Sequence, residues 1–213
     1  DLRMSRGLGD VYKRQIIHDR FVEKGDLKYT LVYVPEGNRP DDNNSDIYDD
    51  IDIVQDDDFS NHIIDKFTRI VQEVSPTTTV KKFTSDSTNR DEILTAFANG
   101  DLEVLTSMKC LDEGVDIPRS ELAIFCASTG NPRQFIQRRG RILRTHKDKK
   151  FAYIHDLVVV PEVSSAAESF NMERNLLAGE IRRVKDFALL SENAYSSVQE
   201  LDDILEYYNL SIF

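Results

Sequence analysis

The chain has 213 residues, of which 40% are hydrophobic, so it can bury one substantial core together with a smaller appendage. No stretch reaches the roughly 20 apolar residues of a membrane span, and no secretory signal is visible, so we expect a cytoplasmic protein without membrane contact. The net charge of -11 is uneven: residues 41–58 hold nine aspartates, whereas residues 131–150 hold eight lysines or arginines and one aspartate. The acidic total therefore does not exclude a polyanionic partner, because the local field decides.

In the first half of the chain, a clear secondary-structure pattern appears only after the N-terminal residues. Residues 1–15 show no convincing periodicity, and we expect a disordered or artefactual tail. A β-branched and aromatic run predicts a strand at 29–34, which Pro35 ends. The acidic residues 41–58 indicate a solvated insertion loop, and apolar residues at helical spacing predict a helix at about 59–74.

Strand and helix signals continue to alternate up to about residue 160. Further strands are expected at 78–83, 103–108, 122–127 and 151–160. One helix is expected to start after a Ser87 or Thr88 cap and to stop at Gly100, and another to start at Asn131 with Pro132 in its first turn. This alternation predicts an α/β domain over residues 16–161, with a mostly parallel sheet covered on both faces.

Pro161 marks the boundary of a C-terminal helical extension, residues 162–213. A first helix carries apolar residues from Phe170 to Ala188 on one face. A second helix is expected to start with a capping box from Ser197 to Glu200. The two helices together would form an antiparallel helical hairpin.

The two cysteines, Cys110 and Cys126, both lie among apolar residues. No second pair of metal ligands accompanies them, so we interpret them as buried thiols in a reducing compartment and expect no metal site.

Basic residues are concentrated in the segment QFIQRRGRILR, residues 134–144. As a helix it would place Gln137, Arg141 and Arg144 on one face at i, i+4 and i+7. The opposite side would bury four apolar residues against the sheet while the arginines project outward: Phe135, Ile136, Ile142 and Leu143. Arginine binds phosphate oxygens through two parallel hydrogen bonds, although a solvated basic helix would explain the pattern about as well.

A second segment, VLTSMKCLDEGVDIP, runs from residue 104 to 118. It predicts a strand followed by a loop in which Gly114 allows an unusual backbone path. Asp116 then presents a carboxylate that can accept hydrogen bonds from ribose hydroxyl groups or orient a nearby arginine. Taken alone, an ordinary loop after a buried strand explains the segment equally well.

Together, in this order and about 20 residues apart, the two segments resemble motifs V and VI of superfamily 2 helicases. LVYVPEG resembles the strand of motif IV, and FTSDSTNRDEILTAFANGDLEVL resembles the segment before motif V, with Arg90, Phe97 and Gly100 in the expected places. The similarity covers roughly residues 28–160. It is closest to DNA-directed members, the XPB/Ssl2-like helicases, restriction translocases and UvrB group, because DEAD-box proteins usually carry His at the position of Gln137.

The resemblance implies the fold of a RecA-like three-layer domain and a role for each matching residue. Arg141 and Arg144 would act as arginine fingers, and the nucleotide region would involve Gly114, Asp116 and Gln137. The nucleic-acid backbone would contact Thr106, Ser107 and Lys109, while Arg133 and Arg138 would bind nucleic acid or support the site. Met108 stands where many relatives have Thr, so Ser107 or Thr106 would supply the missing hydrogen bond.

No P-loop of the form G-x-x-x-x-G-K-[ST] occurs in the chain. The resemblance therefore implies the second lobe of a two-lobed motor, with DNA and an N-terminal RecA-like lobe as partners. ATP with Mg²⁺ would be held mainly by that other lobe, and this chain alone is expected to be inactive. Two alternatives stay open: a non-catalytic module that binds DNA or a partner, and an unrelated α/β domain that binds a small phosphorylated ligand.

Overall fold

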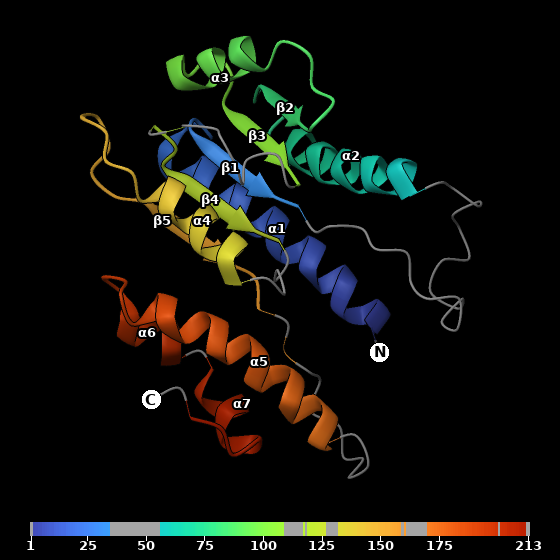
Figure 1. Ribbon diagram of the computed structural model, residues 1–213, viewed down its shortest axis with the longest axis vertical. Coiled ribbons are helices and arrows are strands. Elements are labelled where there is room, and N and C mark those ends of the chain that lie inside the picture. Colours follow the sequence, from blue (N-terminus) through green and yellow to red (C-terminus); the bar gives the residue numbers. More distant parts are fainter. Residues whose placement is uncertain are drawn as a thin grey trace. The chain divides into compact units, whose positions relative to one another are not determined.

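The computed structural model describes residues 2–34, 56–108, 117, 119–126, 132–158, 160, 170–199 and 201–211 (Figure 1). Its contacts divide the chain into a larger unit, Leu2–Leu157, and a C-terminal unit that begins at Val158. That division lies close to the boundary predicted at Pro161. No helix among the described residues combines the length and the apolar character that crossing a bilayer requires.

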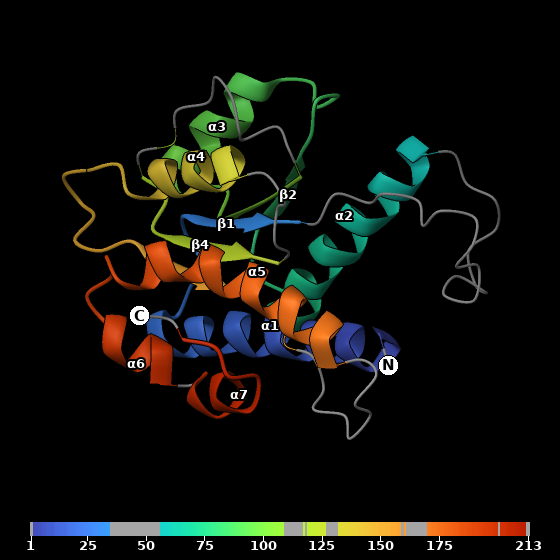
Figure 2. The same cartoon turned by 60° about the horizontal axis from the view of Figure 1, so that its bottom comes forward.

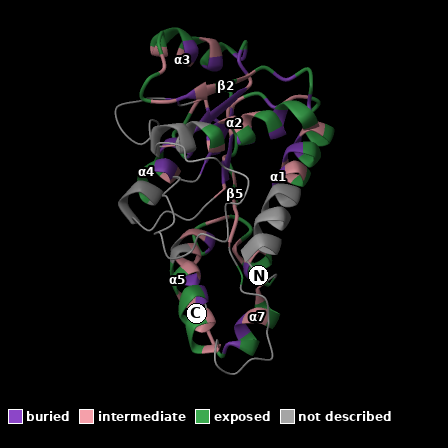
Figure 3. Cartoon of the chain, turned by 90° about the vertical axis from the view of Figure 1, so that its right-hand side faces the viewer, coloured by how far each residue is buried: buried purple, intermediate pink, exposed green. Residues whose placement is uncertain are grey.

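The larger unit is built on a five-stranded sheet in which every pair of neighbouring strands is parallel. The strand order is β2-β3-β1-β4-β5. The strands are β1 (Thr30–Tyr33), β2 (Val80–Phe83), β3 (Val104–Ser107), β4 (Leu122–Phe125) and β5 (Tyr153–Asp156). All residues of the three central strands are buried (Figure 3), which explains their near-continuous apolar sequences. The predicted parallel sheet is therefore confirmed.

Helices cover both faces of this sheet (Figure 2). On one face lie α1 (Leu2–Lys24) and α2 (Asp56–Val74), and on the other lie α3 (Arg90–Asn99) and α4 (Pro132–Ile142). The first face is an apolar cluster in which Ile17 and Phe67 pack with Val32 and Ile124. Because side chains alternate along a strand, the neighbouring residues of β1, β3 and β4 point to α3 and α4.

Helix α1 occupies residues for which the sequence predicted a disordered or artefactual tail, 1–15. It begins at Leu2 and runs without a break past residue 15. Lys13 makes a cation–π contact with the core. Its ammonium lies 3.8 Å from the centroid of the Phe67 ring, and its side chain is buried. Ile17, one turn later, is also buried. A lysine that packs on an aromatic ring leaves no apolar period in the sequence, which is why the helix was not predicted.

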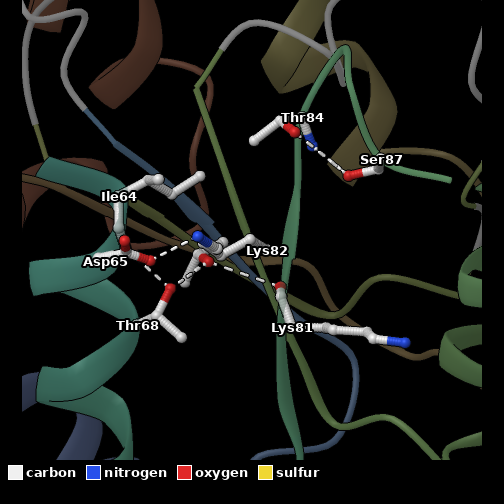
Figure 4. Close-up of polar contacts among 8 residues, drawn as sticks. Ile64, Asp65, Thr68, Lys81, Lys82, Thr84 and Ser87 are labelled. Carbon is white, nitrogen blue, oxygen red and sulfur yellow. Dashed lines mark hydrogen bonds and ion pairs between the residues drawn. The ribbon is translucent and has the colours of Figure 1, made fainter. Parts of the chain in front are cut away.

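The predicted cap of α3, Ser87 or Thr88, lies one or two residues too early, whereas the predicted end is confirmed. Its N-cap is Asn89, in the left-handed region at φ 58° and without a side-chain cap. The Ser87 hydroxyl instead accepts a hydrogen bond of 2.8 Å from the backbone N–H of Thr84 (Figure 4). Gly100 ends the helix at φ 81°, and a Cβ atom there would lie 2.8 Å from the Tyr29 hydroxyl oxygen. Only glycine fits this position without displacing Tyr29.

The C-terminal unit has its own core. It consists of α5 (Phe170–Ala188), α6 (Ala194–Gln199) and α7 (Asp202–Tyr207), which pack around a cluster that includes Leu177, Ile181 and Tyr208. The second predicted helix is thus two short helices. Ser197 lies inside α6, where its hydroxyl donates to the carbonyl oxygen of Asn193 at 3.0 Å, so it does not begin the helix as predicted. The other residue of the predicted capping box, Glu200, lies outside the described residues.

Candidate functional site at the carboxyl ends of the strands

Strands β1 and β4 mark the position in the sheet where a ligand is expected. They are neighbours, but the chain leaves β1 toward the β2 edge and leaves β4 toward the β5 edge. In open parallel sheets, ligands bind outside the carboxyl ends of strands where the connections diverge in this way. Tyr33 and Phe125 end the two strands in register, and their ring centroids lie 4.9 Å apart.

Arg138 fixes the middle of α4 across these strand ends. Its side chain is 3% exposed, and its Nη2 donates a hydrogen bond of 3.0 Å to the backbone carbonyl of Met108, directly after β3. Its guanidinium centre lies 5.2 Å from the centroid of the Tyr33 ring at the end of β1. A charge-assisted hydrogen bond and a cation–π contact therefore tie one arginine of α4 to two strands.

Arg141 lies one turn after Arg138 and is also turned inward. Its side chain is 8% exposed, and its Nη1 is a buried nitrogen that has no hydrogen-bond partner among the described residues. Burying a guanidinium N–H without a partner is costly, so this nitrogen is a candidate for binding a ligand or an ion. Arg141 does not project outward, and this part of the prediction is wrong.

The predicted apolar side of α4 is also wrong in part. Ile142 is fully buried, but Ile136 and Leu143 are 64% and 51% exposed. The buried face is set by Arg138, Arg141 and Ile142, which follow one another at i, i+3 and i+4. Two arginines take inward positions that a hydrophobic pattern assigns to apolar residues.

Gln137 and Arg144 are exposed and do not share the direction of Arg141. Helix α4 ends at Ile142, so Arg144 lies outside the regular helix on which the predicted i+7 relation depends. The structure therefore keeps these three residues within one short segment but places only Arg141 in the interior.

Thr106 and Ser107 are adjacent in β3 and point to opposite faces of the sheet. The Thr106 Oγ1 atom lies 2.7 Å from Oγ1 of Thr68, a residue of α2 that Figure 4 shows beside β2. Ser107 is in register with Tyr33, and its buried Oγ has no hydrogen-bond partner among the described residues. Of the two candidates for a phosphate contact, only Ser107 faces the side of α4.

Several predicted residues fall outside the described part of the chain. These are Lys109, Gly114, Asp116 and Cys110, together with the side chain of Arg133. The acidic segment 41–58 is described only from Asp56 onward, where α2 begins. Cys126 is half-buried, with its Sγ 4.0 Å from the carbonyl oxygen of Ile124, and the described residues contain no group of His, Cys, Asp or Glu that could hold a metal ion.

Sequence reasoning missed Tyr33. Its ring contacts both the Phe125 ring and the Arg138 guanidinium, so it forms part of the surface on which α4 rests. The signal was present, since Tyr33 ends a buried strand shortly before a proline, at the edge of the sheet where parallel strands place their ligands.

Comparison with known proteins agrees with this architecture. Residues 59–146 match the sequence model of the helicase conserved C-terminal domain. A "DNA 3'-5' translocase XPB2" from Sulfurisphaera tokodaii is 45% identical over 71 residues, which cover 33% of this chain and 16% of the relative. A "Putative ATP-dependent helicase IRC3" from Saccharomyces cerevisiae is 29% identical over 118 residues, which cover 54% of this chain and 17% of the relative. The chain thus spans about a sixth of these relatives.

Solved structures support the fold. The DEAD-box splicing factor Prp28 from yeast aligns with a TM-score of 0.53 and 13% identity over 95% of this chain and 35% of that one. Domain 2 of the DEAD-box helicase Mss116p, solved with an RNA duplex, aligns with a TM-score of 0.51 and 11% identity over 96% of this chain and 76% of that one. Residues 59–146 are thus similar to the C-terminal domain of helicases, and the larger unit has the α/β fold of these solved helicase domains.

Proposed function

We propose that this chain is the second motor lobe of an ATP-dependent superfamily 2 DNA helicase or translocase. In this role Arg141 and Arg144 supply arginine fingers to ATP, and the β3 end together with the following residues grips the nucleic-acid backbone. The observation that carries the proposal is Arg141: a buried guanidinium whose Nη1 has no partner among the described residues, on a helix held against the carboxyl ends of parallel strands.

A phosphate group fits this unpaired nitrogen. Guanidinium N–H groups bind phosphate oxygens with short, charge-assisted hydrogen bonds, and a buried site strengthens them because water does not compete. An arginine supplied from a neighbouring domain typically contributes ~10³–10⁵ to the rate of phosphoryl transfer. That range corresponds to about 4–7 kcal/mol of activation free energy.

Arg141 and Arg144 would serve this reaction differently. Arg141 is buried and rests on a helix that Arg138 already fixes, so it suits the stabilisation of charge that develops in the transition state. Arg144 is exposed and follows the helix, so it suits a contact that forms when the two lobes close. Gln137, also exposed on α4, would contact the nucleotide from the same helix.

ATP and Mg²⁺ would be held mainly by a partner lobe that carries a P-loop. That lobe would supply the metal and the phosphate cradle, while this chain contributes the arginines and part of the strand grip. Gly114 and Asp116 would lie near the ribose. In the grip, Ser107 has the hydroxyl best placed for a phosphate contact, since Thr106 is engaged with Thr68 on the opposite face, and Lys109 and Arg133 would add charge.

The relatives' names favour DNA as the nucleic acid on which the proposed motor acts. The XPB2 relative is named a DNA translocase, and its segment of similarity reaches 45% identity. We propose DNA for this chain on that basis, together with Gln137 at the position where RNA-directed DEAD-box proteins usually carry His.

The proposal is tested with Arg141→Ala in the two-lobed motor. ATP turnover with DNA present should fall by about a thousandfold or more, while the Kd for DNA in a titration without ATP changes less than threefold. Arg182→Ala, which removes an exposed arginine of α5 outside the matched segment, is the matched control and should retain turnover.

Two results would contradict the assignment. Turnover that survives Arg141→Ala would remove the arginine from the reaction. A loss of DNA affinity as large as the loss of turnover would assign Arg141 to the strand instead, and an intact motor that binds DNA without hydrolysing ATP would identify a non-catalytic module.

A further inference from the structure

We infer that Lys149 is a positioning residue for the arginine fingers, because it closes the C-terminal end of α4. The inference rests on the proposed function of Arg141. The Lys149 Nζ atom donates two hydrogen bonds of 2.6 Å, one to the carbonyl oxygen of Ile142 and one to that of Arg144. One ammonium group therefore holds both the last residue of the helix and the backbone of a proposed finger.

The end of α4 needs such a partner. The last carbonyl groups of a helix have no intrahelical N–H to bind, and they carry the negative end of the helix dipole. A glycine in the left-handed conformation often closes a helix end, but here the chain continues with Leu143 and Arg144. A lysine that returns from five residues further along supplies both hydrogen bonds and a positive charge.

Lys149 is itself held in a short turn. Its backbone N–H donates to the carbonyl oxygen of His146 at 3.0 Å, and the two residues form an isolated antiparallel bridge. The backbone N–H of Asp148 donates to Nδ1 of His146 at 3.2 Å. The pKa of the Lys149 ammonium lies below its ordinary value, because the effect of burial exceeds the opposing effect of the Glu121 carboxylate. This direction agrees with a charged group that is partly buried.

An ion pair ties this turn to the segment before β4. Asp148 accepts a hydrogen bond of 2.9 Å from Nη1 of Arg119, and the Arg119 guanidinium lies 4.3 Å from the centroid of the Tyr29 ring. Tyr29 in turn accepts backbone hydrogen bonds from Glu121 and Leu122. These contacts therefore connect the turn that holds Lys149 to the amino ends of β1 and β4.

Arg141 lies between two fixed points of α4. Arg138 ties the preceding turn to Met108, and Lys149 binds the carbonyl oxygens of Ile142 and Arg144 that follow. Because Nη1 of Arg141 has no internal partner among the described residues, its direction depends on the helix backbone beneath it. Catalytic groups must be held within about 0.5 Å of their productive geometry, so a loose helix end would misplace the guanidinium.

The test uses Lys149→Met and Lys149→Arg, with Lys147→Met as the matched control. Lys147 is exposed in the same turn, so its substitution removes the same charge and adds the same side chain. In the 213-residue chain, hydrogen exchange of the Leu143 and Arg144 amides should become about tenfold faster in Lys149→Met, because a charge-assisted hydrogen bond contributes roughly that factor or more. Lys149→Arg and Lys147→Met should exchange as the parent does.

In the two-lobed motor, Lys149→Met should lower kcat about tenfold, equivalent to 1.36 kcal/mol of activation free energy, and leave the KM for ATP and the Kd for DNA unchanged. Lys149→Arg should restore kcat. Exchange and kcat in Lys149→Met that equal those of Lys147→Met would overturn the inference. Faster exchange that extends to the amides of Thr30–Tyr33 would also overturn it, since the lysine would then stabilise the fold in general.

The two proposals fail in different ways. If Arg141→Ala retains turnover, the proposed function fails, and exchange at Leu143 and Arg144 still decides whether Lys149 closes the helix. If Arg141→Ala loses turnover while Lys149→Met retains it, only the positioning role is overturned.

Discussion

The two faces of the central sheet use the same strands but differ in how their polar groups are paired near the carboxyl ends of those strands. On the α1/α2 face, the Thr106 hydroxyl is paired with Thr68, and Lys82 forms an ion pair of 2.6 Å with Asp65 (Figure 4). On the α3/α4 face, the Ser107 hydroxyl and the Arg141 Nη1 are buried without a hydrogen-bond partner among the described residues. On the α1/α2 face, Thr30 Oγ1 and Arg20 Nη2 also lack a hydrogen-bond partner among the described residues, but Thr30 begins β1, at the opposite end of the sheet. We propose that the unpaired groups at the carboxyl ends of the strands identify the face that receives a ligand.

The unpaired groups carry a cost that this sheet tolerates. Leaving a buried donor or acceptor without a partner costs about 1–3 kcal/mol, and more for a charged group. A phosphate oxygen at Nη1 of Arg141 would recover part of that free energy on binding. The difference between the faces can therefore be measured as stability.

The largest difference is expected between two arginines of the same helix. Arg138→Met should lower the free energy of unfolding by about 2 kcal/mol, because it removes a charge-assisted hydrogen bond and leaves the Met108 carbonyl unpaired. Arg141→Met should leave it unchanged or raise it, since Nη1 of Arg141 loses no hydrogen bond with a described residue. Urea denaturation of both variants measures the contrast, and equal losses would show that Arg141 is paired in solution.

A smaller difference is expected between the two adjacent residues of β3. Thr106→Val keeps the shape of the side chain but removes its hydrogen bond to Thr68, and should cost about 1 kcal/mol. Ser107→Ala removes a buried hydroxyl without a partner among the described residues, and should be neutral or stabilising. Thermal melting compares the two, and a larger loss in Ser107→Ala would reverse our assignment of the faces.

The last effect concerns Tyr208, a buried hydroxyl of the C-terminal unit that does have a partner, and it changes only at high pH. Burial and the Glu173 carboxylate, which accepts its hydrogen bond at 2.7 Å, raise the pKa of Tyr208 to about 12. Because the folded pKa lies above the ordinary value of 10.0, this contribution to stability is complete below pH 10 and is lost as the pH rises toward 12.

Tyrosinate absorbance measures this titration, and the difference from Tyr208→Phe assigns the signal among the eight tyrosines. Glu173→Gln should move the pKa down toward its ordinary value. A Tyr208 that titrates near 10 in the parent chain would show that its hydroxyl is open to water.

The sheet could be predicted from the sequence because short runs of β-branched and apolar residues are typical of buried strands. Strands β1, β3 and β4 are buried on both faces, and each lies within its predicted range. The turn at Gly100 was also predictable, since its left-handed backbone favours glycine.

What failed depends on contacts between distant residues. Lys13 occupies a core position of α1 only because the Phe67 ring accepts its ammonium. Arg141 turns inward because Arg138 and Ile142 fix that face of α4. A pattern that counts lysine and arginine as polar and outward assigns both helices incorrectly. It also misses that Leu201 lies between α6 and α7.

The alternation of Thr106 and Ser107 makes the reading frame of β3 part of the site. Inserting or deleting one residue within the strand would rotate every later side chain to the opposite layer, so the serine would meet α2 and its neighbour would turn toward α4. Natural variation in this strand should therefore change residue identities but not length. An engineer who grafts this lobe onto another motor should treat the spacing from β3 to its loop as fixed.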